Sequence, residues 1–351
     1  MNVGVVCYLP RHMTKLLPVV YKLVSRGVNV HGFYDTRKEP LPKGRVPDEP
    51  MQTRLAFEMV GVPTSGYRSV SGLKLQLERN RIQCVVIPET HNLNNVICGG
   101  HIVNMCREIG IRTVVVQHGQ VIKQSLKAFV PMRADVFCAW GEWTKSKMVS
   151  AGADPKKIVV TGYPELDELA GGDADTRKKV AKRVVQILSG ISPKSRLCCI
   201  MSHVTMNESL LQLICSTVRM NGYEPIVVTP PRDRIEKIGK TRILKGNNPR
   251  IFIAAADLCI TGPSTIAIEC IVLRRPIVIV TGGDEFKVPF PSLGVAAGLN
   301  ASSATNSTLT KAMSTAMKMC NSRSYKNFCA LYLNVDGNAA SRVVDVVTWD
   351  R

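Results

Sequence analysis

The residues best suited to chemistry lie in the stretch AAADLCITGPSTIAIECIVLRRPIVIV, residues 254–280. Its apolar run at 257–261 is too short for a typical helix and predicts a buried strand, which ends at Gly262. Ser264 or Thr265 can cap the helix that follows. Because the N-terminus of a helix collects unpaired N–H groups and the positive end of the helix dipole, this turn is suited to binding an anion.

A carboxylate follows within the same helix. Glu269 lies five residues beyond Ser264 and is expected in the second helical turn. There its oxygens can accept hydrogen bonds from vicinal hydroxyls, such as those of a ribose, beside a diphosphate held at the helix start. An ordinary strand–helix unit with a well-capped helix has the same pattern, so the stretch alone leaves both interpretations open.

Other polar residues follow predicted buried strands. Glu89-Thr90-His91 follows the strand at 84–88, His118 follows the strand at 112–117, and Ser202-His203 follows the strand at 197–201. Open α/β sheets bind ligands at the carboxyl ends of their strands. Because histidine titrates near neutrality, His118 is suited to act as a base, although a structural histidine bonded to the backbone fits equally. Ser202 and His203 are candidate phosphate contacts.

The bulk composition favours an α/β protein of two domains. A chain of 351 residues is long enough for two cores, and with 45% hydrophobic but only 5% aromatic residues these must be mainly aliphatic. Such composition is typical of parallel strands buried on both faces. Strands and helices alternate in both halves, and the acidic, glycine-containing segment 165–175 is the best linker candidate. No GxGxxG dinucleotide motif opens the first half.

The charge balance indicates an anionic partner. Lys and Arg number 46 against 27 Asp and Glu, a formal net charge of +19. Such a surface favours a polyanion or an anionic membrane face. No long basic run is present, so sequence-specific reading of bases is not indicated. No apolar run approaches the length of a membrane span, and the first residues do not fit a signal peptide. We therefore expect a cytoplasmic protein, either free or peripheral on the inner face of a membrane.

The 12 cysteines do not form a recognisable framework. Most lie inside apolar runs and none forms a CxxC pair, which favours buried free thiols in a reducing compartment. Metal-ligand spacing is absent, so we expect no metal site.

Four segments together resemble the GT-B glycosyltransferase superfamily. The nearest branch contains the CDP-glycerol glycerophosphotransferases and the surface-polysaccharide transferases. The resemblance is carried by VVVQHGQ (114–120), ADVFCAWGEWTKSKMVSAGADPKKIVVTGYPELDEL (134–169), ADLCITGPSTIAIECIVLRRPIVIV (256–280) and DGNAASRVVDVV (336–347).

The resemblance implies two Rossmann-like domains facing a central cleft. Residues 1–165 would form the N-terminal, acceptor-side domain and residues 166–325 the C-terminal, donor-binding domain. Residues 326–351 would return to the N-terminal domain as C-terminal helices, the last of which crosses back. No cofactor is implied beyond the nucleotide-sugar substrate, and no DxD metal motif is evident. The sequence assigns no oligomeric state.

The resemblance also assigns roles to the candidate residues. The donor diphosphate would meet Gly262, Ser264 and Thr265, and Glu269 would bind the ribose. Ser202 and His203 would contact phosphate. His118 would be the acceptor base or an acceptor contact.

The expected function is transfer of a sugar from a UDP-type donor to an anionic or membrane-associated acceptor. The acceptor would be a lipid-linked saccharide, a polysaccharide or modified DNA. A CDP-glycerol donor is a less favoured alternative, because Gln117 replaces the Trp that usually precedes the His-Gly pair in that branch. A UDP-GlcNAc 2-epimerase-like isomerase is another alternative, although its acidic pairs and Ser-Gly-Gly motif are missing. A non-catalytic protein that binds nucleotide sugars or nucleic acid is the third.

Overall fold

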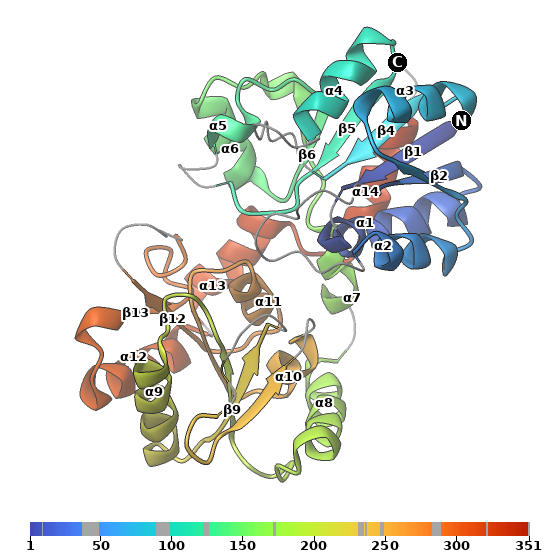
Figure 1. The fold of residues 1–351 in the computed structure, drawn as a ribbon. Helices are drawn as coiled ribbons and strands as arrows, with labels where there is room; N and C mark the ends of the chain where they lie inside the picture. The colour runs from blue at the N-terminus through green and yellow to red at the C-terminus, as the bar shows by residue number, and fades with distance from the viewer. Residues whose placement is uncertain are drawn as a thin grey trace. The chain divides into compact units, whose positions relative to one another are not determined.

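The computed structural model describes two units, each a parallel sheet covered by helices (Figure 1). Unit 1 comprises Met1–Ala170 and Ala330–Arg351, and unit 2 comprises Gly171–Cys329. Within these ranges the structure describes all residues except 9, 37–48, 89–98, 122–125, 171–172, 231–234, 236, 246–248, 283–288, 321 and 350–351.

Unit 1 contains a seven-stranded parallel sheet in its described part, in the order β3-β2-β1-β4-β5-β6-β7. Its strands are β1 (Asn2–Cys7), β2 (Asn29–Asp35), β3 (Thr64–Tyr67), β4 (Cys84–Ile87), β5 (Arg112–Val116), β6 (Val136–Ala139) and β7 (Ile158–Val160). Its α-helices are α1 (Pro10–Ser25), α2 (Glu49–Glu58), α3 (Val70–Arg79), α4 (Gly99–Glu108), α5 (Leu126–Phe129), α6 (Glu142–Ser150), α7 (Asp167–Ala170) and α14 (Ala339–Thr348).

Unit 2 contains a six-stranded parallel sheet in its described part, in the order β10-β9-β8-β11-β12-β13. Its strands are β8 (Leu197–Met201), β9 (Glu224–Thr229), β10 (Arg242–Lys245), β11 (Leu258–Thr261), β12 (Ile277–Thr281) and β13 (Ala297–Asn300). Its α-helices are α8 (Ala174–Ser189), α9 (Glu208–Met220), α10 (Arg250–Ala255), α11 (Ile266–Val272), α12 (Asn306–Met319) and α13 (Arg323–Phe328).

The central strands are buried along their whole length. Strands β4, β8 and β11 read CVVI, LCCIM and LCIT, and every residue in them is buried. Helices cover both faces of a parallel sheet, so each side chain of a central strand enters one of two cores. The described cysteines are free thiols and only Cys329 is partly exposed, as the sequence predicts. Burial raises the pKa of the Cys84 thiol to about 12.

The C-terminal segment belongs to unit 1, although it follows unit 2 in the chain. Val343, Val344 and Val347 of α14 are buried in the same core cluster as β1 and α1. The helix start is fixed by Asp167, whose carboxylate accepts hydrogen bonds from the backbone N–H groups of Ala339 (3.0 Å) and Ala340 (2.7 Å). This carboxylate supplies the N-terminal cap that Asn338 does not provide with its own side chain.

The predicted fold class is confirmed as two Rossmann-like α/β units with parallel sheets. The sequence placed its boundaries at 165/166 and 325/326, and the structure divides the chain after Ala170 and after Cys329. Strand β8 has the predicted limits, whereas the sequence gives no prediction for the edge strand β10. Among the described helices, none has the length and apolar character needed to cross a membrane.

Replacement of Asp167 by alanine tests the attachment of α14. The substitution leaves two helical N–H groups without their carboxylate acceptor, so the free energy of unfolding of unit 1 should fall by about 1–2 kcal/mol. Urea denaturation measures the loss. Glu108→Ala, which removes an exposed carboxylate from α4, is the matched control and should change little. Equal stabilities of the two variants would contradict the capping role.

Candidate functional site

In unit 2, the predicted phosphate-binding residues lie at the point where the strand order reverses. The chain passes from β8 to β9 on one side and later returns to β11 on the other side of β8. Open α/β sheets bind ligands beside the carboxyl ends of two such strands, where the helices that follow diverge. Ser202 and His203 follow β8, and Gly262, Ser264 and Thr265 follow β11. The structure therefore brings these sequence candidates to one edge of one sheet.

The ring of His203 lies directly against the backbone of Gly262. A Cβ atom built on Gly262 would lie 2.2 Å from Cγ of His203, far inside van der Waals contact. Glycine is thus required here by a close approach and not by a left-handed backbone. The histidine ring and the turn after β11 form one packed unit.

Hydrogen bonds indicate which nitrogen of His203 carries the proton. The backbone N–H of Thr205 donates to Nδ1 of His203 at 3.3 Å, and the Thr205 hydroxyl lies 3.1 Å from the same nitrogen. The single proton of that hydroxyl can be donated either to Nδ1 or to the carbonyl of Val280 at the end of β12, so the backbone N–H is the contact that assigns the tautomer. Because Nδ1 accepts, the neutral ring carries its proton on Nε2, which makes Nε2–H a donor suited to a phosphate oxygen. Burial lowers the pKa of His203, which favours the neutral ring.

The turn into α11 differs in detail from the prediction. Thr265 occupies the cap position but makes no side-chain capping bond. The hydroxyl of Ser264 accepts a long hydrogen bond, 3.4 Å, from the backbone N–H of Ile266. The Ser264 hydroxyl therefore caps the helix only weakly and the Thr265 hydroxyl does not cap it, and both residues are partly exposed.

Glu269 is buried and paired within unit 2. It lies in the first turn of α11, one turn earlier than predicted, with 7% of its surface exposed. Its Oε2 atom accepts a hydrogen bond from Nε of Arg250 on α10, at 2.9 Å. The arginine fixes the carboxylate, and a carboxylate can accept further hydrogen bonds, as a ribose would require.

In unit 1, the strand order reverses between β1 and β4, and His118 lies close to that point. His118 follows β5, but its Nδ1 atom lies 3.0 Å from the carbonyl oxygen of Pro88, at the end of β4. A carbonyl only accepts, so Nδ1 donates, and in the neutral ring Nε2 is the basic nitrogen. The buried ring of His12 on α1 stands edge-on to that of His118, with the centroids 5.5 Å apart. Glu89-Thr90-His91 lies outside the described residues.

Gln117 holds the turn that carries His118. Its Nε2 donates to the carbonyl of Gly119, and its Oε1 accepts from the backbone N–H of Trp140, both at 2.8 Å. Its own carbonyl accepts from the indole Nε1 of Trp140, also at 2.8 Å. Trp140 is fully buried and stacks on Tyr163 with the centroids 4.0 Å apart. Gln117 thereby joins the ends of β5 and β6 and leaves His118 little freedom.

Among the described residues, no group of three or more His, Cys, Asp or Glu side chains is arranged to hold a metal ion. The expectations of no metal and no cofactor remain predictions.

The protein resembles known proteins in structure but not in sequence. No protein-family model matches the chain, and no curated protein matches it by sequence. Solved structures match along its whole length. UDP-GlcNAc 2-epimerase from Neisseria meningitidis bound to UDP-GlcNAc has a TM-score of 0.67 at 14% identity, covering 98% of this chain and 99% of that one.

Two further matches come from other proteins of this architecture. The glycotransferase of kitacinnamycin has a TM-score of 0.61 at 12% identity, covering 97% of this chain and 93% of that one. HepE from Anabaena in complex with UDP-glucose has a TM-score of 0.61 at 10% identity, with 99% of each chain covered. The chain has the GT-B fold. Identities this low establish the fold alone.

Sequence reasoning missed several residues of the candidate site. Arg250 and Thr205 are polar residues without a motif. Arg250 acts through a tertiary contact to Glu269, and Thr205 acts through the turn that brings its N–H to His203. In the sequence, Gln117 is only a departure from a family pattern. Its position directly before His118, at the end of an apolar strand, was the available signal.

Replacement of Gly262 by alanine tests the packing of His203. The new methyl group would collide with the ring, so His203 should move and the free energy of unfolding should fall by about 1–3 kcal/mol. Histidine ring NMR and denaturation report the two effects. Gly298→Ala is the control, because a Cβ there meets only Pro291, at the ordinary distance of 3.6 Å. An unshifted His203 signal in Gly262→Ala would refute the contact.

Replacement of Gln117 by leucine tests the support of His118. The Gly119 carbonyl and the Trp140 N–H would lose their side-chain partners, which costs about 1–3 kcal/mol for each group that stays buried. We expect lower stability and a changed NMR environment of His118. Gln52→Leu, at an exposed position on α2, is the control. If His118 signals were the same in both variants, Gln117 would have no positioning role.

Proposed function

We propose that the protein transfers a sugar from a nucleotide-activated donor of the UDP type to an acceptor. The observation that carries the proposal is the cluster of Ser202, His203 and Gly262 at the strand-order reversal of unit 2. The structural likeness to proteins solved with UDP-GlcNAc and with UDP-glucose supports it.

The donor would be held by its diphosphate and its ribose. The Nε2–H group of His203 donates to a phosphate oxygen, and Ser202, Ser264 and Thr265 contribute hydroxyl or backbone donors around Gly262. Glu269, held by Arg250, accepts from the ribose hydroxyls. Donors fixed before the reaction stabilise the charge that develops on the diphosphate as it leaves.

His118 would act on the acceptor through Nε2. In the transfer, an acceptor hydroxyl oxygen forms a bond to the anomeric carbon of the sugar, and the bond from that carbon to the diphosphate oxygen breaks. The nucleoside diphosphate leaves with the bonding electrons, and the hydroxyl proton passes to Nε2 of His118.

The acceptor would be anionic or membrane-associated, such as a lipid-linked saccharide or a polysaccharide. The net charge of +19 supports this class. The same positive charge would also attract DNA, in which a modified base would be the acceptor. Sugar transfer to DNA and not to lipid would overturn this part of the proposal.

An isomerase of the UDP-GlcNAc 2-epimerase kind is the second candidate. It is favoured by the TM-scores of 0.67 for two epimerases, against 0.61 for the glycotransferase of kitacinnamycin. An isomerase needs no acceptor, so incubation with UDP-GlcNAc alone distinguishes the two. Appearance of the epimer in the proton NMR spectrum would establish the isomerase.

Calorimetric titration with UDP, UDP-sugars, other nucleotide sugars and CDP-glycerol tests the donor site. We expect a UDP-sugar to bind and His203→Ala to weaken binding about 10- to 100-fold, because a hydrogen bond to a charged group is lost. Glu269→Gln should weaken the nucleotide but not inorganic diphosphate. Binding of CDP-glycerol alone would reassign the donor.

His118→Ala distinguishes donor binding from the transfer step. It should keep donor affinity and lose turnover with acceptor. Wild-type affinity in His203→Ala and Glu269→Gln, or full turnover in His118→Ala, would contradict the assignment.

A further inference from the structure

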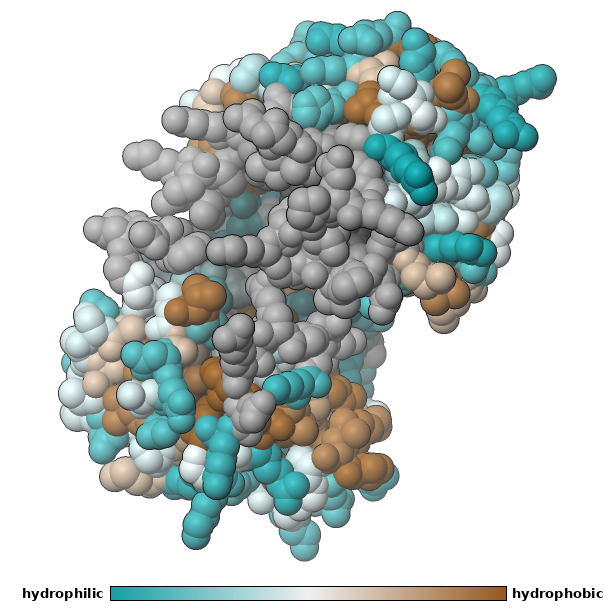
Figure 2. Space-filling view, in the orientation of Figure 1, coloured by the Kyte–Doolittle hydropathy of each residue, from teal (hydrophilic) through white to brown (hydrophobic). Residues whose placement is uncertain are grey.

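Helix α8 has a second apolar face, which is exposed in the part of unit 2 that the structure describes. Its inward face is ordinary, with Ala181, Val185 and Ser189 buried. On the outside, Val180, Ile187 and Leu188 have exposed fractions of 54%, 82% and 55%. Figure 2 shows apolar side chains gathered at the lower right, where Figure 1 places α8.

The exposed apolar residues form one stripe. Val180, Val184, Ile187 and Leu188 are spaced at i, i+4, i+7 and i+8, which places them on one side of a helix. Val184 is partly exposed. We call these four residues the α8 stripe. Scattered exposed apolar residues need no explanation, but a stripe along one helix marks an interaction surface.

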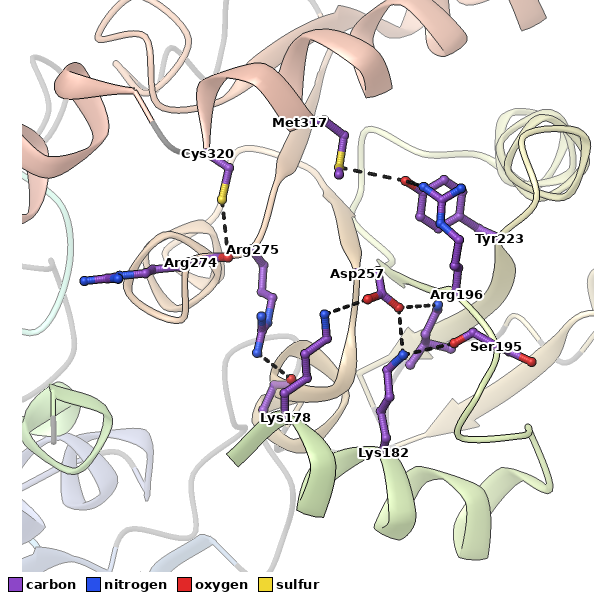
Figure 3. Close-up of polar contacts among 12 residues, drawn as sticks. Lys178, Lys182, Ser195, Arg196, Tyr223, Asp257, Arg274, Arg275, Met317 and Cys320 are labelled. Carbon is purple, nitrogen blue, oxygen red and sulfur yellow. Dashed lines mark hydrogen bonds and ion pairs between the residues drawn. The ribbon is translucent and has the colours of Figure 1, made fainter. Parts of the chain in front are cut away.

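The orientation of α8 is fixed by ion pairs on its inner side. Nζ of Lys178 lies 2.6 Å from one carboxylate oxygen of Asp257, and Nζ of Lys182 lies 3.0 Å from the other (Figure 3). Burial raises the pKa of Asp257, but the bonds from Lys178, the Leu197 N–H and Lys182 outweigh it, so the pKa lies below its usual range. Because Lys178 and Lys182 bind Asp257 on the inner side of α8, the α8 stripe lies on the side of the helix that faces away from the sheet.

Basic residues border the stripe. Lys179 and Arg183 are exposed and lie one turn apart along its edge. Within α8 the basic residues are Arg177, Lys178, Lys179, Lys182 and Arg183, against Asp175 as the only acidic one. An apolar stripe edged with cations is the pattern of a helix that lies in the interface of an anionic bilayer.

We propose that α8 docks the protein on an anionic membrane surface, with the α8 stripe inserted among the lipids and Lys179 and Arg183 on the headgroup phosphates. A second copy fits less well, because a two-fold contact would bring the same cations of both chains together. DNA fits less well, because its phosphate backbone provides no apolar surface in which the aliphatic side chains of the stripe could be buried. The inference goes beyond the proposed function and does not depend on a nucleotide donor.

Vesicle flotation of the full chain, without nucleotide, tests the proposal. The vesicles contain phosphatidylcholine alone, or phosphatidylcholine with phosphatidylglycerol in roughly equal amounts. The wild-type protein should float with the anionic vesicles and be released by salt. Ile187→Ser with Leu188→Ser should reduce partitioning about tenfold or more, because both side chains lose their apolar insertion.

Matched controls distinguish vesicle binding through the α8 stripe from nonspecific binding by other surfaces of the protein. Met220→Ser removes an apolar side chain with a similar exposed fraction, 73%, from another helix of unit 2, and should bind as the wild type does. Lys179→Gln with Arg183→Gln should weaken binding and its salt dependence more than Lys311→Gln with Lys318→Gln on α12, where both lysines are exposed. Unchanged melting temperatures would show that all variants fold.

Three results would overturn the proposal. The wild-type protein could fail to bind anionic vesicles at low salt, or the α8 variants could bind as well as the controls. Sedimentation could also show a wild-type dimer that Ile187→Ser dissociates, without vesicle binding, which would assign the stripe to self-association. Loss of donor binding in the calorimetric titration would leave this test unaffected.

Discussion

The proposed donor and acceptor residues are positioned by one constraint of parallel sheets. Each strand must return to the same end of the sheet through a crossover, and in both units the direction of crossover reverses once, beside β1 and beside β8. At the reversal, the helices that follow neighbouring strands go to opposite faces of the sheet. The carboxyl ends there are left for loops. Ser202, His203 and Gly262 lie on these loops in unit 2, and in unit 1 His118 follows β5 and contacts the carbonyl of Pro88 at the end of β4.

The two histidines show how one residue type is given two roles by its hydrogen-bond partners. A carbonyl oxygen faces Nδ1 of His118, so its Nε2 is basic, whereas a backbone N–H group faces Nδ1 of His203, so its Nε2 carries the proton. One ring is thereby prepared to receive a proton and the other to donate a hydrogen bond. Neither assignment is visible in sequence, because it depends on the backbone geometry that brings Pro88 to His118 and Thr205 to His203.

The sequence was most informative where one local signal decides the structure. The apolar run Leu197–Met201 is too short for a typical helix and predicts a buried strand, and α8 is bounded by a capping Asp173 and by Gly190 in the left-handed conformation. It failed where the structure depends on contacts between distant segments. Strand β10, with the mixed sequence RILK, lies at the sheet edge and has no buried residue to reveal it. The pairing of Glu269 with Arg250 likewise joins two helices whose sequences give no sign of it.

The central claim is that a nucleotide diphosphate binds at the reversal of unit 2, on His203. Ring nitrogen NMR of the six histidines during titration with UDP tests it most directly. The account predicts that the Nε2–H signal of His203 shifts with saturating UDP, and that Gly262→Ala abolishes this shift. A titration in which UDP binds but leaves the His203 signal unmoved would contradict it.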